Sequence, residues 1–130
     1  MLLVMGSAPL QMQEHQPTRA QAEKYVDDYM ARTIPHVDAN DLLYYVNASR
    51  NYNPAPKLST ITTPVLWINS ADDFINPPEL GIPEKLVTQM PHAKFILIPI
   101  SDATRGHGTH TVANVWKQYL IDFLAQTDKK

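Results

Sequence analysis

Apolar residues in the first part of the chain recur every three or four positions, which is the spacing of a helix with one apolar face. Thr18 and Gln21 form the pattern of a capping box, in which each side chain satisfies the backbone N–H of the other, and this predicts a helix that ends near Pro35. A second helix is predicted from about residue 40 to residue 49, and an apolar run at residues 2–5 reads as a short strand. The apolar face predicted for the first helix consists of Ala22, Tyr25, Val26, Tyr29 and Met30.

The hydrophobic pattern changes after a turn-rich stretch at residues 51–56. Residues 64–69 and 95–100 are unbroken apolar runs without alternation, as expected for strands buried on both faces of a parallel sheet. Each run is followed by a helical pattern, the first containing Leu86, Val87 and Met90 and the second extending from residue 112 to residue 124. The order strand, helix, strand, helix predicts an α/β sheet over residues 59–130, preceded by a helical, lid-like segment at residues 1–58.

Composition narrows the class of protein. The 130 residues carry a net charge of −2 without a basic block, which argues against nucleic-acid and anionic-membrane partners. The absence of cysteine excludes disulfides, thiolate metal sites and a cysteine nucleophile. No apolar run reaches the roughly 20 residues needed to span a bilayer, and no basic start precedes the first apolar residues. We therefore expect a soluble protein, and a cytoplasmic one by default.

The candidate chemistry follows the two predicted strands. Asp73 comes shortly after the first and has Pro77 four residues later; His107 lies between two glycines after the second. Ligands bind at the carboxyl ends of strands in open α/β sheets, so both side chains are expected at one edge. Their order along the chain matches the acid and the base of a Ser-His-Asp triad. Asp72 is the competing acid, but it lacks the four-residue spacing to Pro77.

These residues also allow plainer interpretations. An aspartate after a strand often caps a turn, and a histidine in a glycine-rich loop is often merely solvated. His107 and His110 are three residues apart and could bind a metal, although no acidic or third histidine ligand stands near them in the sequence. The remaining histidines have no paired context: His15, His36 and His92.

A nucleophile motif is not found. The sequence Gly-x-Ser-x-Gly does not occur in the chain. Ser7 lacks the second glycine, and Ser70 and Ser101 stand beside the acid and base turns without a strand–turn–helix elbow. The sequence therefore predicts two members of a triad, Asp73 and His107, and not the third.

Several motifs together resemble the C-terminal part of homoserine O-acetyltransferase-like α/β-hydrolase proteins, over most of residues 36–126. The segments that carry the resemblance are Asp38–Tyr44, Ala48–Pro54, Ile68–Asp73, Asn76–Gly81 and Arg105–Thr109. The resemblance implies the C-terminal part of an α/β-hydrolase fold, with a partial parallel sheet and flanking helices. It also implies that Asp73 is the acid and His107 the base.

The resemblance further implies acyl transfer through a serine acyl-enzyme, with acetyl-CoA as the acetyl donor and a small hydroxyl compound as the acceptor; some relatives are plain hydrolases. No bound cofactor is expected beyond acetyl-CoA as a co-substrate. The half of the fold that bears the nucleophile is not recognised here, so the chain is expected to be inactive alone. It would need a chain carrying the N-terminal half, or self-association, to cover its sheet edge. The alternative is a non-catalytic oligomerising or binding module derived from the same fold.

Overall fold

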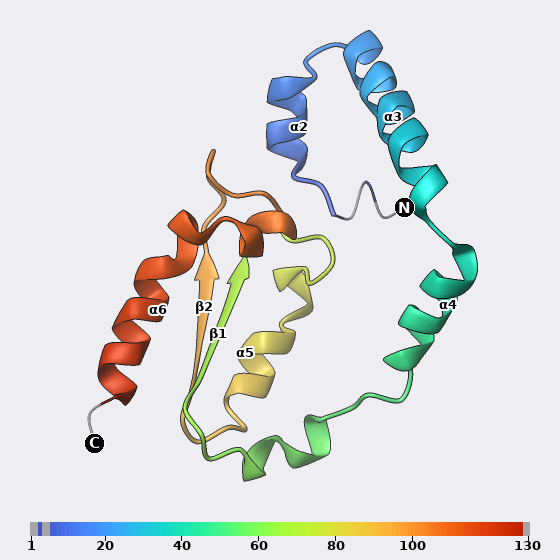
Figure 1. Cartoon of the computed structure of the whole chain (residues 1–130). Helices are drawn as coiled ribbons and strands as arrows, with labels where there is room; N and C mark the ends of the chain where they lie inside the picture. Colours follow the sequence, from blue (N-terminus) through green and yellow to red (C-terminus); the bar gives the residue numbers. More distant parts are fainter. Residues whose placement is uncertain (1–2, 4–5, 129–130) are drawn as a thin grey trace.

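The computed structural model describes residue 3 and residues 6–128, and it shows a mixed α/β chain with a two-stranded parallel sheet (Figure 1). The helices and strands follow in the order α2 (Pro9–His15), α3 (Arg19–Thr33), α4 (Ala39–Ala48), β1 (Val65–Ser70), α5 (Ile82–Val87), β2 (Ala93–Ile98) and α6 (Ala113–Thr127). Short 3₁₀ turns η1 (Ile34–His36), η2 (Ala55–Thr60), η3 (Pro78–Leu80) and η4 (Gly108–Thr111) connect them.

The starts of the long N-terminal helices follow local chemistry. The capping box predicted at α3 is present, with the Gln21 backbone N–H donating to the Thr18 hydroxyl and the Thr18 N–H donating to the Gln21 side chain. The Asp38 carboxylate caps α4 by accepting hydrogen bonds from the backbone N–H groups of Asn40 and Asp41. Helix α2 was not predicted; Pro9 stands at its first position, where the missing N–H costs no hydrogen bond. The strand predicted at residues 2–5 falls largely outside the described residues, and Leu3, its one described member, is helical.

The apolar face of α3 is not buried. Neither α3 nor α4 has a buried residue, and Val26 and Met30 are both more than a third exposed. The two helices form an arc that leads away from the sheet (Figure 1). The amphipathic pattern correctly predicted helix, but the face that the pattern marks as apolar is only partly covered: Ala22, Tyr25 and Tyr29 are half-buried, and Tyr25 lines a cavity beside α2.

The sheet joins the two apolar runs in parallel, with Val65 opposite Ala93 and Ser70 opposite Ile98. Both runs form strands as predicted, with bounds shifted by one or two residues; Pro99, which has no N–H, follows the end of β2. The rings of Trp67 and Phe95 meet edge to face, with centroids 6.0 Å apart. Helix α5 ends at Val87, so Met90 lies in the turn before β2, where it is buried.

Burial on both faces of the sheet was predicted and is only partly present. The strands lie between α6 and α5 (Figure 1), yet of β1 and β2 only Ser70 and Ile98 are buried. One helix on each side of a two-stranded sheet covers it incompletely, and this leaves most strand residues half-buried. Among the described residues, no helix combines the length and the apolar character needed to cross a membrane.

Candidate active site

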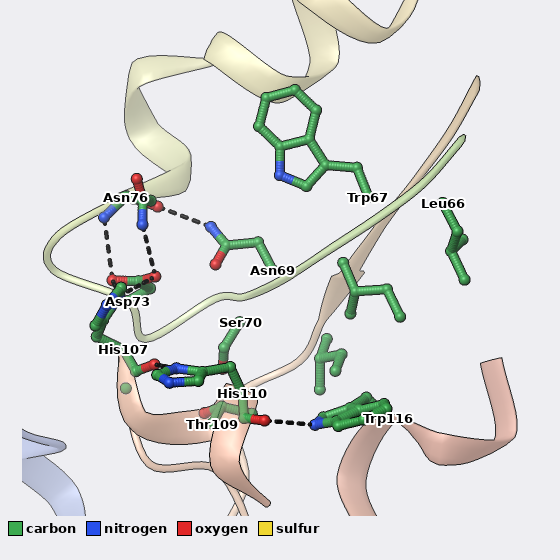
Figure 2. A pocket seen from close by; sticks show the side chains of 13 residues that line it. Leu66, Trp67, Asn69, Ser70, Asp73, Asn76, His107, Thr109, His110 and Trp116 are labelled. Atoms are coloured by element: carbon green, nitrogen blue, oxygen red, sulfur yellow. Dashed lines mark hydrogen bonds and ion pairs between the residues drawn. The ribbon is translucent and has the colours of Figure 1, made fainter. Parts of the chain in front are cut away.

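The structure brings Asp73 and His107 together at the carboxyl ends of the two strands. The Nδ1 atom of His107 lies 3.1 Å and 3.2 Å from the two carboxylate oxygens of Asp73 (Figure 2). Asp73 is 4 % exposed, whereas the His107 side chain is 36 % exposed. An ionised carboxylate only accepts hydrogen bonds, so in the neutral imidazole the proton is on Nδ1. Nε2, the nitrogen that could accept a proton from a nucleophile, is then left without a bond to Asp73.

Asp73 also organises its own turn. Its carboxylate accepts hydrogen bonds from the backbone N–H of Ile75 at 2.8 Å and of Asn76 at 3.0 Å, and from the Asn76 side-chain amide at 3.3 Å. Burial opposes ionisation of this carboxyl, but the donors of Asn76, His107 and Ile75 outweigh burial and lower its pKa below the usual value. The capping interpretation and the acid interpretation of Asp73 are therefore both compatible with its contacts.

The loop that carries His107 depends on a glycine. Gly106 has a φ of +56°, a left-handed conformation that residues with a side chain rarely adopt. A Cβ atom at this position would overlap the Ser7 carbonyl oxygen and come within 3.2 Å of the Asp72 carbonyl oxygen. The sequence pattern Gly-His-Gly was expected to allow a tight turn, and at position 106 the turn requires a glycine.

Asp72, the competing acid, does not contact the His107 ring. Its carboxylate accepts from the Ser70 hydroxyl, from the Thr104 hydroxyl at 2.8 Å and from the Gly106 backbone N–H at 3.0 Å. Burial opposes its ionisation, but the hydrogen bonds, first those from Ser70 and Thr104, leave its pKa below the usual value. The four-residue spacing to Pro77 thus distinguished the aspartate that meets the histidine from the one that does not.

A cavity of about 470 Å³ adjoins the pair. Its wall combines five successive residues of β1 with the His107 loop and the start of α6 (Figure 2). The residues that line it are Leu66, Trp67, Ile68, Asn69, Ser70, Asp73, Asn76, Ile98, Gly106, His107, Thr109, His110 and Trp116. Apolar side chains and a convergent set of polar ones share the wall, a combination that can bind and orient a small molecule.

Sequence analysis did not identify Asn69, Asn76 or Trp116 as part of this site. The Asn69 side-chain amide donates to the Asn76 carbonyl oxygen at 2.8 Å, and the Trp116 indole N–H donates to the His110 carbonyl oxygen at 3.1 Å. Asn76 lies within the Asp-x-x-x-Pro spacing and Asn69 lies at the end of a predicted strand, so both positions could have been marked. Trp116 read only as part of a helical apolar stripe.

The hydroxyl groups in the cavity wall are already engaged. Ser70 donates to Asp72, and the Thr109 hydroxyl accepts from the backbone N–H of Arg105 at 2.8 Å. Neither hydroxyl is hydrogen-bonded to the His107 ring. The cavity therefore contains an arranged acid and base, and neither of these two hydroxyls is placed as the nucleophile.

The structure gives the other histidines no shared site. The His110 Nδ1–H donates to the His107 carbonyl oxygen, 2.6 Å away. The ring centroids of His110 and His107 lie 5.3 Å apart. Over residue 3 and residues 6–128, no three His, Asp or Glu side chains are grouped in a way that could hold a metal ion. His15 lines a second cavity of about 280 Å³ beside α2, and His36 and His92 are exposed.

None of the protein-family models, curated proteins or solved structures that were compared with the chain matches it.

Proposed function

We propose that Asp73 and His107 are the acid and the base of a Ser-His-Asp-type triad, and that the chain is the C-terminal part of an α/β-hydrolase-like acyl-transfer enzyme. The observation that carries the proposal is the contact between His107 Nδ1 and both oxygens of the buried Asp73 carboxylate, beside a cavity large enough for a small substrate. The positions after two adjacent parallel strands and the chain order acid, then base, support the same assignment.

In this proposal His107 moves the proton and Asp73 orients the ring. Asp73 accepts from Nδ1–H, which leaves the Nε2 lone pair to take the proton of a hydroxyl nucleophile as that oxygen attacks an acyl carbon. The imidazolium that forms is stabilised by the adjacent carboxylate and then gives its proton to the leaving group. The lowered pKa of Asp73 keeps that carboxylate ionised near neutral pH.

The resemblance to homoserine O-acetyltransferase-like proteins supports acetyl-CoA as the donor. The hydroxyl oxygen of the nucleophile would bond to the acetyl carbon while the carbon–sulfur bond breaks, and the thiol would leave with the proton from His107. A hydroxyl group of the acceptor would then attack the acyl-enzyme and give its proton to His107, which passes the proton to the nucleophile oxygen as the bond between that oxygen and the acyl carbon breaks. The products balance as an O-acetyl ester and free coenzyme A.

The nucleophile would come from a polypeptide segment that covers the free edge of β1. Val65 and Ala71 donate their backbone N–H groups to residues of the β2 segment, at 3.1 Å and 2.9 Å. Peptide groups alternate in direction along a strand, so those of Leu66 and Ile68 point to the opposite edge. The described part of the chain supplies no third strand there, and β1 contains no charged residue that would discourage pairing.

The exposed area also favours a covering partner. The chain of 14.7 kDa exposes 9989 Å², against about 6,900 Å² expected for a folded monomer of this mass. The excess of about 3,000 Å² is of the size that permanent complexes bury. The same excess supports the alternative function, a module that self-associates without catalysis, because a second copy would also cover it.

The test is acetyl transfer by the protein recovered from its native source under mild conditions. We expect a complex or a longer polypeptide that contains a nucleophile serine and transfers acetyl from acetyl-CoA to a hydroxyl acceptor. In it, His107→Ala lowers kcat about 10²–10⁴-fold, as for loss of a general base. The matched control is His92→Ala, which removes an exposed histidine directly before the start of β2, at the end of that strand opposite to His107.

Two outcomes would contradict the proposal. One is an active assembly in which His107→Ala and His92→Ala have the same activity. The other is a homo-oligomer of this chain alone without acyl-transfer activity, which would instead support the non-catalytic module.

A further inference from the structure

Asp72 connects two segments that are far apart in the sequence. Its carboxylate is buried and accepts from Ser70 in its own segment, and from Thr104 and Gly106 some 30 residues later. Thr104 is 0 % exposed; its oxygen lies 2.8 Å from both Asp72 and the Ser101 carbonyl oxygen and accepts from the Ser101 N–H. A hydroxyl has one proton to donate, and a carboxylate is the stronger of the two acceptors.

The contacts of Asp72 lie one residue before the contacts of the proposed catalytic pair. Asp72 accepts from Gly106, and Asp73, the next residue, faces His107, the residue after Gly106. The two contacts are therefore neighbouring links between the same turn and the same loop. Gly106 is needed for this approach, because a side chain there would overlap the Ser7 carbonyl oxygen.

The link through Asp72 is the better suited of the two to hold the loop. It uses a backbone amide and a fully buried hydroxyl, which have few other positions to adopt. The Asp73–His107 contact ends on a ring that is about one-third exposed and can rotate about its side-chain bonds. An exposed contact of that kind fixes geometry poorly by itself.

We propose that Asp72 is a positioning residue, which fastens the His107 loop to the Asp73 turn and thereby holds the imidazole with Nδ1 toward the acid. This inference rests on the proposed function for its catalytic meaning, but its geometric content stands on the contacts alone. Asp72 is not hydrogen-bonded to the ring and does not itself line the cavity, so it acts through Gly106 and Thr104.

The test measures the tautomer of His107 by ¹⁵N NMR of the labelled full chain. In the neutral imidazole of the parent protein we expect the Nδ1–H tautomer to predominate, because Nδ1 faces the Asp73 carboxylate. In Asp72→Asn the position of Oδ2, which accepts from both Thr104 and Gly106, is taken either by the amide N–H₂, which loses both bonds, or by a neutral oxygen, which accepts them without the charge of the carboxylate. Either arrangement weakens the link. We expect His107 to lose its predominant Nδ1–H tautomer and to become a mixture with Nε2–H.

The matched control is Asp102→Asn, which makes the same change of charge at an exposed position on the same loop. We expect the His107 signals to keep their parent tautomer in this variant. The indole resonances of Trp67 and Trp116 report in each variant whether the sheet and α6 remain folded.

A second pair of variants tests the proposal if Asp72→Asn does not fold. Thr104→Val removes the hydroxyl at nearly constant volume, and Thr104→Ser retains it. We expect Thr104→Val to change the His107 tautomer in the same direction as Asp72→Asn, and Thr104→Ser to keep the parent tautomer. A folded Asp72→Asn or Thr104→Val with the parent tautomer would overturn the proposal. Unfolding of both would also overturn it, since Asp72 would then serve general stability.

These outcomes are independent of the proposed reaction. A tautomer that depends on Asp72 in a protein without acyl-transfer activity would support the positioning link and contradict the function. Full acyl-transfer activity together with a His107 tautomer that is unchanged in Asp72→Asn would support the function and contradict the positioning link.

Discussion

The segment from residue 9 to residue 60 and the segment from residue 65 to residue 127 hold their shape by different means. The first consists of helices whose ends are set by neighbouring residues, as at Thr18 and Asp38, and it buries only Gln11 and Leu58. The second contains the sheet and a set of buried polar side chains, namely Ser70, Asp72, Asp73, Thr104 and Thr109. Within this set Asp72, Asp73 and Thr104 make hydrogen bonds to residues more than 30 positions away.

The difference indicates which interactions fix the structure of each segment. Helices α3 and α4 are held by local hydrogen bonds, and much of their apolar surface remains exposed. Helix α2 differs, because the Gln11 side-chain amide donates to the Ser101 carbonyl oxygen in the second segment. In the second segment the polar groups are buried, and each must find a partner because an unsatisfied buried group costs free energy. The site lies in the segment where those requirements fix the side chains.

The largest difference between the two segments is expected in their response to acid. The folded-state pKa values of Asp72 and Asp73 are below the ordinary aspartate value of 3.8, so the stabilising contribution of these carboxylates is present above about pH 4 and is lost as the pH falls through the folded-state values. Both residues are in the second segment, and both tryptophans, Trp67 and Trp116, report on it. We expect the tryptophan fluorescence to change below pH 4 while much of the helical circular dichroism persists.

Helix α3 contains an internal comparison for this titration. The pKa of Asp28 is also lowered, first by its hydrogen bond with Lys24, but that pair is exposed and contributes little to stability. NMR amide signals of α3 should therefore change less than those of β1 over the same pH range. A tryptophan signal that stays constant down to pH 2 would contradict the role of the buried carboxylates.

The next effect in size is expected from truncation of an apolar side chain in each segment. Ile98 is 6 % exposed at the end of β2, and Leu43 in α4 is 56 % exposed. Ile98→Ala should lower the free energy of unfolding by about 2–5 kcal/mol, because it leaves a cavity beside the site. Leu43→Ala should change it by less than about 0.5 kcal/mol, as for an exposed position.

Urea unfolding followed by tryptophan fluorescence measures the value for Ile98→Ala, and unfolding followed by the NMR amide signals of α4 measures the value for Leu43→Ala. Equal losses in the two variants would mean that α4 is packed as firmly as the sheet, and the contrast between the segments would then be wrong.

The smallest effect is expected from two glycine substitutions with the same backbone conformation. Gly81 and Gly106 have φ values of +60° and +56°, but only Gly106 has atoms close to where a Cβ would lie. Gly81→Ala should cost about 1 kcal/mol for the left-handed conformation alone. Gly106→Ala should cost about 2–3 kcal/mol, because the loop must also move away from Ser7.

The same urea experiment distinguishes them. If Gly106→Ala costs no more than Gly81→Ala, the loop is free to move and the Ser7 contact does not hold it.

Part of the fold and of the site could be predicted from local patterns. The runs at residues 64–69 and 95–100 became β1 and β2, because unbroken apolar runs suit a parallel pair. Asp73 and His107 were selected by their positions after these strands, and parallel pairing places both ends at one edge. The bounds of the strands were less certain, since a residue such as Ala93 joins β2 only because Val65 lies opposite it.

Other features had no local signal. Helix α2 lacks a capping pattern, and the exposure of α3 contradicts what its apolar face indicated. The role of Asp72 was not found because its partners, Thr104 and Gly106, are more than 30 residues away. A periodicity shows which side of a helix is apolar, but it does not show what covers that side.

The sequence alone determined the start of α3, the parallel strand pair and the two residues that meet at the candidate site. These depend on hydrogen bonds and spacings within a few residues, together with the rule that parallel strands end at one edge. The tertiary structure decided which aspartate holds the His107 loop and which apolar surfaces stay open. Those outcomes depend on burial and on contacts between distant residues, because a buried carboxylate is stable only where the folded chain brings donors to it.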